Sequence, residues 1–296
     1  MDINFELYKV FYTVAKSGSF SAAAKELFIT QSAVSQSIRN LENKLGACLL
    51  IRGTRSVQLT NVGEMLMSHV DQAYNLLKSA EHKINEMKSL SLGEIRIGVG
   101  DTILRYLLTP LLQQFLAGYP KIKLQIINRT SSGIMDSIKK GAVDFGIVTM
   151  PVDDNDIETK EFCEVEDVFV ASSRFDKYRS TSVSLRELSC IPLLLLQKDS
   201  MTRRNLDDYF TSKGISITPE IELESVELLV EYARIGLGIA HVLKESAQAH
   251  IQSGELFVIK LEDPMPKRRL CIAKLTSVPL PPAASVFVEK LRNSPF

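Results

Sequence analysis

The sequence has no net charge, no long apolar run and no closely spaced cysteines. Its 35 Lys and Arg residues balance 35 Asp and Glu residues, which argues against a nucleic-acid partner if the charges are evenly spread. The longest apolar run, residues 191–196, is too short for a membrane helix, which needs about 18 residues, so we expect no membrane partner. The start, MDINFELYKVF, lacks a basic segment followed by an apolar one, so we expect a cytoplasmic protein without a secretory signal.

Metal-binding and catalytic motifs are also missing. The four cysteines, Cys48, Cys163, Cys190 and Cys271, form no CxxC pair and have no histidine at metal-ligand spacing, so we expect no metal site. Their apolar neighbours favour inert core thiols over the alternative of a redox switch through Cys163 and Cys190. No HExxH, GxSxG or Walker sequence occurs, so we expect neither catalytic residues nor a cofactor. An enzyme, to which the first 60 residues would be only an appendage, is the weaker alternative.

The composition that is present fits a folded protein of about two domains. The chain has 296 residues, of which 45% are hydrophobic and 24% charged, as in ordinary globular proteins. The charge is unevenly distributed, because residues 1–60 hold seven basic and four acidic side chains. This segment therefore carries +3 and the remainder carries −3, so a nucleic-acid partner for the first segment is open again.

The first 60 residues have the pattern of three helices and a hairpin. An apolar stripe from Leu7 to Val14 predicts a first helix that ends near Ser17-Gly18. A second helix is expected at about residues 21–28, and a third starts after a capping Thr30 and runs to about Leu45. Short strands are expected at residues 49–52 and 57–60. This order of elements is that of a winged helix-turn-helix.

The third helix has the composition of a helix that reads DNA bases. One face is polar without being strongly charged, and the opposite face is apolar, so the polar face is available to the major groove. Gln pairs with adenine and Arg with guanine, so the side chains expected to reach base edges are Gln31, Ser32, Ser35, Gln36 and Arg39. Those expected to bind phosphates are Thr30, Arg52, Thr54 and Arg55. The alternative is a solvated helix face beside a solvated hairpin.

Residues 60–88 contain no proline and predict one long helix. Apolar and small side chains recur at alternating steps of four and three, a period of 3.5 that is typical of a helix paired with another. The positions are Val62, Leu66, His69, Ala73, Leu76, Ala80, Lys83 or Ile84, and Met87. We therefore expect this helix to form a homodimer, and the alternative is an ordinary helix that covers a core.

The rest of the chain alternates strands and helices, which indicates α/β layers. A polar stretch at residues 151–158 indicates a break between subdomains. Helical patterns occur between the strands, for example at residues 104–116 and 225–235. The expected strands are residues 94–99, 122–128, 143–149, 168–172, 191–196, 220–224 and 237–242.

Short polar side chains follow several of these strands, where open α/β sheets bind ligands. Hydroxyl groups and helix N-termini at such places suit an anionic group of a small molecule. Asp101 would repel an anion but would suit the ammonium group of a zwitterion. The alternative is that these residues only cap helices. The candidates are Gly100, Asp101, Thr102, Ser131, Ser132, Thr149, Ser200, Thr202, Arg203 and Ser225.

The N-terminal sequence resembles the LysR-type transcriptional regulators. The resemblance lies in FYTVAKSGSFSAAAKELFITQSAVSQSIRNLENKLGACLLIRGTRSVQLTNVGE, which covers the helices, the wing and the Thr-x-x-Gly that follows them at Thr60 to Gly63. It is specific within residues 5–65 and continues weakly to the C-terminus. One departure is Ser32, where family members often have proline, and serine there leaves the fold intact.

The resemblance implies a winged helix-turn-helix domain at residues 1–59, a linker and dimerisation helix at residues 60–89 and an effector-binding domain at residues 93–296. That last domain would resemble periplasmic solute-binding proteins. Its first subdomain would comprise residues 93–162 and 265–296, and its second residues 163–264.

The resemblance also implies assembly and effector contacts. It implies a homotetramer of two dimers on an interrupted dyad in double-stranded promoter DNA, and it places effector contacts at the strand ends of Thr102, Ser131, Thr149 and Thr202. The function expected is allosteric. A co-inducer, anionic or zwitterionic, would reorient the two subdomains and change access of RNA polymerase without catalysis.

Overall fold

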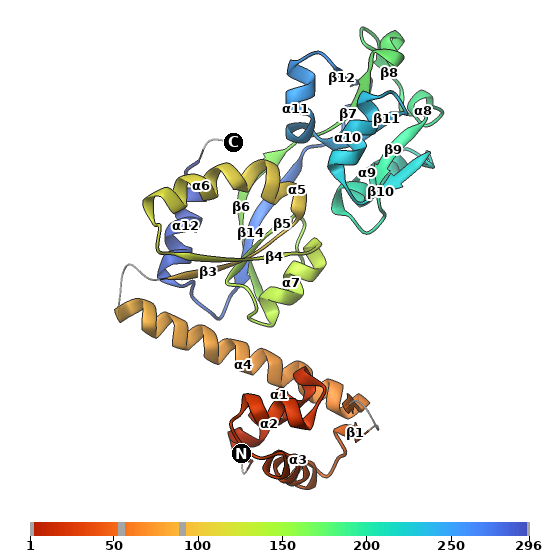
Figure 1. Ribbon diagram of the computed structural model, residues 1–296. Helices are drawn as coiled ribbons and strands as arrows, with labels where there is room; N and C mark the ends of the chain where they lie inside the picture. Colours follow the sequence, from red (N-terminus) through yellow and green to blue (C-terminus); the bar gives the residue numbers. More distant parts are fainter. Residues whose placement is uncertain (1–2, 53–56, 89–92, 295–296) are drawn as a thin grey trace. The chain divides into compact units, whose positions relative to one another are not determined.

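The computed structural model describes residues 3–52, 57–88 and 93–294 and divides into two compact units, Met1–Glu81 and His82–Phe296 (Figure 1). Within these ranges no helix is long and apolar enough to span a membrane. The same part of the chain holds no group of His, Cys, Asp and Glu side chains placed to bind a metal ion.

The N-terminal unit has the three helices, hairpin and long helix that the sequence predicts. Asn4, Ser19 and Thr30 cap the first three helices with their side chains, and Gly18 and Gly46 end two of them in the left-handed conformation. The second helix ends two residues before the expected Phe28. The elements are α1 (Phe5–Ser17), α2 (Phe20–Glu26), α3 (Gln31–Leu45), β1 (Leu50–Arg52), β2 (Val57–Leu59) and α4 (Asn61–Lys88).

The Thr-x-x-Gly sequence fixes the start of α4 against the hairpin. The Thr60 hydroxyl donates to the carbonyl oxygen of Cys48 at 2.8 Å and accepts from the Gly63 amide at 2.9 Å. A Cβ atom on residue 63 would lie 2.1 Å from the Leu49 carbonyl oxygen, so only glycine fits there. This motif therefore has a structural role.

The helix α4 uses one face for the core of its own unit. Val70 is buried, and Leu66 and Tyr74 pack against the core of α1 to α3, with the Tyr74 ring 4.6 Å from that of Tyr12. Leu66 thus faces inward, although the heptad pattern assigned it to a partner helix. Of the other expected partner positions, those up to Ala80 are open to solvent or half-buried, and Val62 is 42% exposed. The side chains of Lys83, Ile84 and Met87 lie outside the described part of the structure.

Subdomain I of the C-terminal unit is a five-stranded sheet in the order β4-β3-β5-β14-β6, in which β3 is parallel to β4 and β5, and β14 is antiparallel to β5 and β6. Helices α6 and α12 cover one face and α7 covers the other (Figure 1). Its strands are β3 (Glu94–Val99), β4 (Lys123–Asn128), β5 (Phe145–Thr149), β6 (Ile157–Val165) and β14 (Arg268–Leu275). Its helices are α5 (Asp101–Ile103), a π-helical turn (Leu104–Leu108), α6 (Thr109–Gly118), α7 (Ser131–Lys139) and α12 (Pro282–Arg292).

Subdomain II has a second five-stranded sheet, in the order β10-β9-β11-β7-β12. Helices α8 and α9 cover one face, and α10 and α11 the other. Its strands are β7 (Asp167–Ser172), β9 (Leu193–Leu196), β10 (Ile221–Leu223), β11 (Ile239–Leu243) and β12 (Leu256–Val258), beside a small pair, β8 (Ser182–Val183) and β13 (Lys260–Leu261). Its helices are a 3-10 helix (Ser173–Tyr178), α8 (Leu185–Leu188), α9 (Met201–Ser212), α10 (Val226–Arg234) and α11 (Lys244–Gln252).

Five strands were not expected from the sequence: β6, β8, β12, β13 and β14. The strand β6 is a partly exposed edge strand with many charged side chains, so it has little apolar signal. It extends three residues past the expected end of subdomain I at residue 162. The chain therefore passes between the two sheets at Glu166, and it returns before Arg268.

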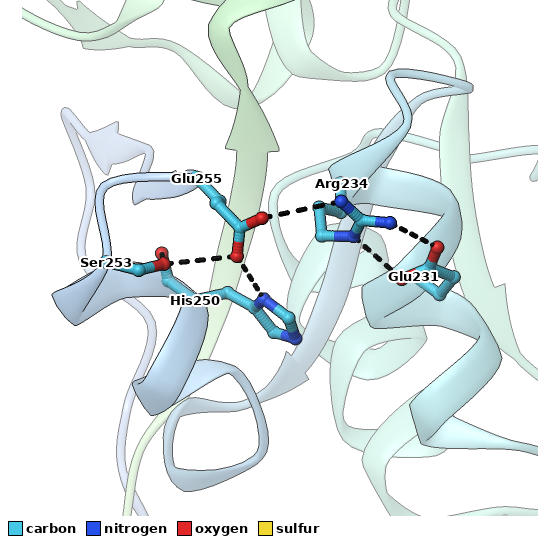
Figure 2. A network of polar contacts seen from close by, with 5 residues as sticks. All are labelled: Glu231, Arg234, His250, Ser253 and Glu255. Atoms are coloured by element: carbon cyan, nitrogen blue, oxygen red, sulfur yellow. Dashed lines mark hydrogen bonds and ion pairs between the residues drawn. The ribbon is translucent and has the colours of Figure 1, made fainter.

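A surface network joins α10 to α11 and to the loop before β12 (Figure 2). Arg234 pairs with Glu231 at 2.7 Å and with Glu255 at 3.4 Å, and Glu255 also accepts from Ser253 and contacts His250 Nδ1 at 2.8 Å. Hydrogen bonds from His250 and Ser253 hold the pKa of Glu255 below its usual range. All of these groups are partnered, so the network braces the helices that cover the second sheet.

The expectation of four core thiols holds only in part. Cys271 is buried, Cys163 is half-buried, and Cys48 and Cys190 are exposed, so the expectation is wrong for the last two. Burial raises the pKa of Cys163 to about 12, with a smaller contribution from the charge of Glu245. Cys163 therefore stays protonated near neutral pH, which disfavours reaction as a thiolate.

His241 is a buried histidine in β11, packed 4.7 Å from the Phe169 ring on the face that α9 covers. Its Nε2 atom has no hydrogen-bond partner within the described ranges. Burial lowers the pKa of His241 from 6.5 to about 4, and the nearby Asp167 works in the opposite direction. His241 is therefore neutral in the folded protein at physiological pH.

We expect the free energy of unfolding to fall as the pH falls from 6.5 to about 4, because the unfolded chain binds a proton at His241 that the folded chain does not bind. The loss reaches about 3 kcal/mol from this residue. Urea unfolding over this pH range measures it, with His241→Phe as the comparison. Equal pH slopes for the two proteins would contradict the assignment.

Candidate functional sites: a DNA-reading helix and a ligand cleft

The helix α3 presents its polar face to solvent. Val34, Ile38 and Leu41 are fully buried on the opposite face. Gln31, Ser32, Gln36 and Arg39 are exposed, and Ser35 is half-buried. The helix is thus anchored by one face and free along the other, as entry into a major groove requires.

Several of the expected DNA contacts also have local roles. Thr30 caps α3 by accepting from the Ala33 amide at 3.2 Å, and its hydroxyl lies 2.9 Å from that of Ser32. Gln31 accepts from Ser21 of α2 at 3.1 Å, which ties the two helices of the motif together. Arg52 ends β1, although its side chain lies outside the described part of the structure, as do Thr54 and Arg55 entirely.

A cleft of about 450 Å³ lies between the two sheets of the C-terminal unit. Its walls come from the carboxyl ends of β3, β4 and β5 in subdomain I and of β9 and β10 in subdomain II. This is the position that open α/β sheets give to ligands. The sequence candidates that line it are Gly100, Asp101, Thr102, Ser131, Thr149, Ser200 and Thr202.

Three candidates do not line the cleft. Ser132 is exposed, with its hydroxyl 3.1 Å from that of Thr130, and Ser225 caps α10 by accepting from the Leu228 amide at 3.3 Å. Arg203 is only 2% exposed and points into the protein, where it donates to Asp207, to Glu222 and to the Leu196 carbonyl. The positive charge of Arg203, which was expected in the cleft, is therefore compensated inside the protein by two carboxylates and a carbonyl oxygen. The side chain stabilises α9 from within.

Arg268, which was not among the residues expected from the sequence, lines the cleft instead. It is 9% exposed and forms an ion pair with Asp167. It lies in a run of charged residues, Lys267 to Arg269, that reads as a solvated loop. No local pattern distinguishes it, because its partners Thr149 and Asp167 are 119 and 101 residues away in the sequence.

The cleft offers hydrogen-bond donors at its floor and carboxylates among its exposed walls. Helices α7 and α9 begin at Ser131 and Met201, both in the lining, so their free amide groups lie beside the cleft. Ser200 caps α9 by accepting from the Arg203 amide at 3.2 Å, and its hydroxyl proton stays available. The charged lining residues are Asp101, Arg129, Asp199, Glu224 and Arg268.

A contact between the subdomains adjoins the cleft. Arg105 pairs with Glu227 of α10 at 2.8 Å, and the Tyr106 hydroxyl donates to the same carboxylate at 3.2 Å. Both residues lie in the π-helical turn that follows the lining residues Asp101 to Ile103. Burial and the charge of Glu227 raise the pKa of Tyr106 to about 12, so the phenol remains a donor. Arg105 lies only two residues after Ile103 of the cleft lining, so a displacement of this cleft wall would also displace the contact with Glu227.

Two family profiles cover almost the whole chain. The profile described as "Bacterial regulatory helix-turn-helix protein, lysR family" matches residues 5–64, and that described as "LysR substrate binding domain" matches residues 88–295. A "Probable RuBisCO transcriptional regulator" of Emiliania huxleyi is 28% identical over 270 residues, which are 89% of this chain and 86% of the relative. The transcriptional activator CmpR of Synechocystis is 28% identical over 257 residues, covering 86% of this chain and 84% of the relative.

Solved structures share the fold. Full-length OxyR C199D from Pseudomonas aeruginosa is similar with a TM-score of 0.74 and 22% identity, over 99% of this chain and 96% of that chain. ArgP from Mycobacterium tuberculosis gives a TM-score of 0.73 at 20% identity, over 98% and 97%. An exposed recognition helix joined to a two-subdomain ligand cleft defines a DNA-binding regulator with an effector-binding domain. The chain belongs to the LysR family of transcriptional regulators.

Proposed function

We propose that a small molecule bound in the cleft controls how this regulator binds promoter DNA and whether it activates or represses transcription. The observation that carries the proposal is the position of the cleft, with hydroxyl groups of both subdomains facing one space of about 450 Å³. A ligand that contacts Thr102 on one side and Thr202 on the other binds one relative orientation of the subdomains better than another. That difference in affinity is what shifts the equilibrium.

The proposed effector carries an anionic group and fits best if it also carries an amine. Thr102, Thr149 and the helix N-termini supply donors for a carboxylate or another oxyanion. Asp101, Asp199 and Glu224 are exposed carboxylates that would bind an ammonium group and repel a molecule with several negative charges. No cofactor or metal is part of the proposal.

We further propose a homodimer through α4 and a homotetramer of two such dimers, with RNA polymerase as the partner whose access the assembly controls. The helix α4 carries the exposed apolar side chains Val62, Met65 and Leu77. Exposed apolar side chains on a long helix are stabilised when they pack against a second copy of the same helix. Several linked DNA-reading units then bind one promoter more tightly than one unit with its modest charge of +3.

Replacing Thr102 and Thr149 together by valine is expected to abolish the effector response and leave promoter binding intact, because two hydroxyls of the cleft are lost at nearly constant volume. A thermal-shift screen of the full chain with small carboxylates, amino acids and inorganic anions identifies a ligand, and promoter binding with and without it measures the response. Thr211→Val, at an exposed position of α9, is the matched control. An unchanged response in the double variant would place the effector elsewhere.

A further inference from the structure

Arg268 and Asp167 lie at the two points where the chain passes between the subdomains. Asp167 is the first residue of β7 in the second sheet, directly after the first crossover. Arg268 is the first residue of β14 in the first sheet, directly after the second crossover. The side chain of Asp167 is 5% exposed and that of Arg268 is 8% exposed. A buried ion pair therefore joins the two crossovers, which together form the hinge between the subdomains.

The guanidinium group of Arg268 is only partly used by this pair. Its Nε and Nη2 atoms donate to the two carboxylate oxygens of Asp167. Its Nη1 atom has one weak contact, 3.5 Å from the Thr149 hydroxyl oxygen, and no other acceptor within the described ranges. A guanidinium carries two N–H groups on each terminal nitrogen, so Nη1 keeps donor capacity beside the cleft.

We propose that Arg268 anchors the anionic group of the effector and thereby couples occupancy of the cleft to the hinge. The inference rests on the proposed function, in that the cleft must bind the effector. A carboxylate or other oxyanion at the cleft floor accepts from Nη1 of Arg268 and from the Thr149 hydroxyl. The same guanidinium then serves the ligand and Asp167 together.

This arrangement links binding to the relative position of the subdomains. A ligand oxyanion competes with Asp167 for the charge of Arg268, so it changes the strength of a bond that joins both crossovers. A second cavity of about 420 Å³ is lined by the same Arg268 and by Asp167, together with Met150, Tyr209 and Met265. Arg268 therefore lines both the cleft and this second cavity.

Binding of inorganic sulfate tests the anchor, because sulfate is the simplest oxyanion that needs only these donors. Calorimetric titration of the full chain compares sulfate with chloride at equal ionic strength. Asp167→Asn removes the competing carboxylate and is expected to tighten sulfate binding about tenfold. Asp167→Asn combined with Arg268→Met removes the whole pair and is expected to weaken sulfate binding about 10- to 100-fold. Arg269→Met, at an exposed neighbour paired with Glu161, is the matched control and is expected to change nothing.

The opposite directions expected for Asp167→Asn and for the double variant separate an anchor from a structural brace, which would weaken binding in both. Absence of sulfate binding to the wild-type chain, or equal binding in the wild type and the double variant, would overturn the proposal. Promoter binding tests the proposed function separately. An effector response that survives in the double variant refutes the anchor only, whereas Arg268-dependent anion binding without any effect on promoter binding refutes the proposed function only.

Discussion

Replacing Asp167 by asparagine is expected to lower the free energy of unfolding by about 3–5 kcal/mol. The substitution leaves the guanidinium of Arg268, whose side chain is 8% exposed, without a counter-charge. A buried charge that loses its partner is costly because protein does not replace its lost hydration. The loss is a large part of the 5–15 kcal/mol that is typical of a domain. Urea or thermal unfolding of the full chain measures the change.

The double variant with Arg268→Met separates the charge effect from a packing effect. It removes the stranded cation, so it is expected to recover most of the stability lost in Asp167→Asn. Arg269→Met is the exposed comparison, because its ion pair with Glu161 is open to solvent and contributes less than about 1 kcal/mol. If the double variant is as unstable as Asp167→Asn, the ion pair is not the origin of the effect.

Replacing Arg39 by alanine is expected to weaken specific promoter binding about 10- to 100-fold and to relax base preference at one position of the site. Arg39 is exposed on the polar face of α3, two turns after the helix begins at Gln31, and its guanidinium has the geometry to bind guanine through two hydrogen bonds. Competition binding with promoter variants measures both effects at fixed salt concentration.

Asn43→Ala is the control for Arg39→Ala. Asn43 is exposed one turn further along the same helix, beyond the turns expected to enter the groove. The control is expected to change promoter affinity less than twofold, since it removes no base contact. Equal losses in the two variants, or no loss in Arg39→Ala, would show that α3 does not read bases in the expected register.

The DNA-reading unit could be predicted closely because its signals are local. Thr30 caps α3, Gly18 and Gly46 end helices, and Val34, Ile38 and Leu41 follow the helical period into the core. Each signal spans only a few residues, so neighbouring sequence is enough to place each helix. The sequence did not show which apolar residues of α4 face the core of their own unit and which are left for a partner helix, because both environments favour the same apolar residues.

The C-terminal unit was predictable only where strands are apolar and followed by short polar residues. This pattern placed Thr102, Thr149 and Thr202 at strand ends, and the structure brings all three to one cleft. The edge strand β6 and the returning strand β14 were missed because charged residues dominate the first, and nothing local marks the second. Arg203 was assigned to the cleft because a sequence does not reveal which way a helix turns its first residues.

The sequence by itself determined that this protein has a helix-turn-helix unit whose third helix is polar on one face, a long helix with an apolar period of 3.5 residues and an α/β domain with polar strand ends. Only the tertiary structure decided which of those polar groups meet, that Arg203 braces α9, and that Arg268 reaches the cleft beside Thr149. The reason is physical. Caps and periodicity act over one or two helical turns, whereas the cleft is assembled by two crossovers that bring together residues more than 100 positions apart.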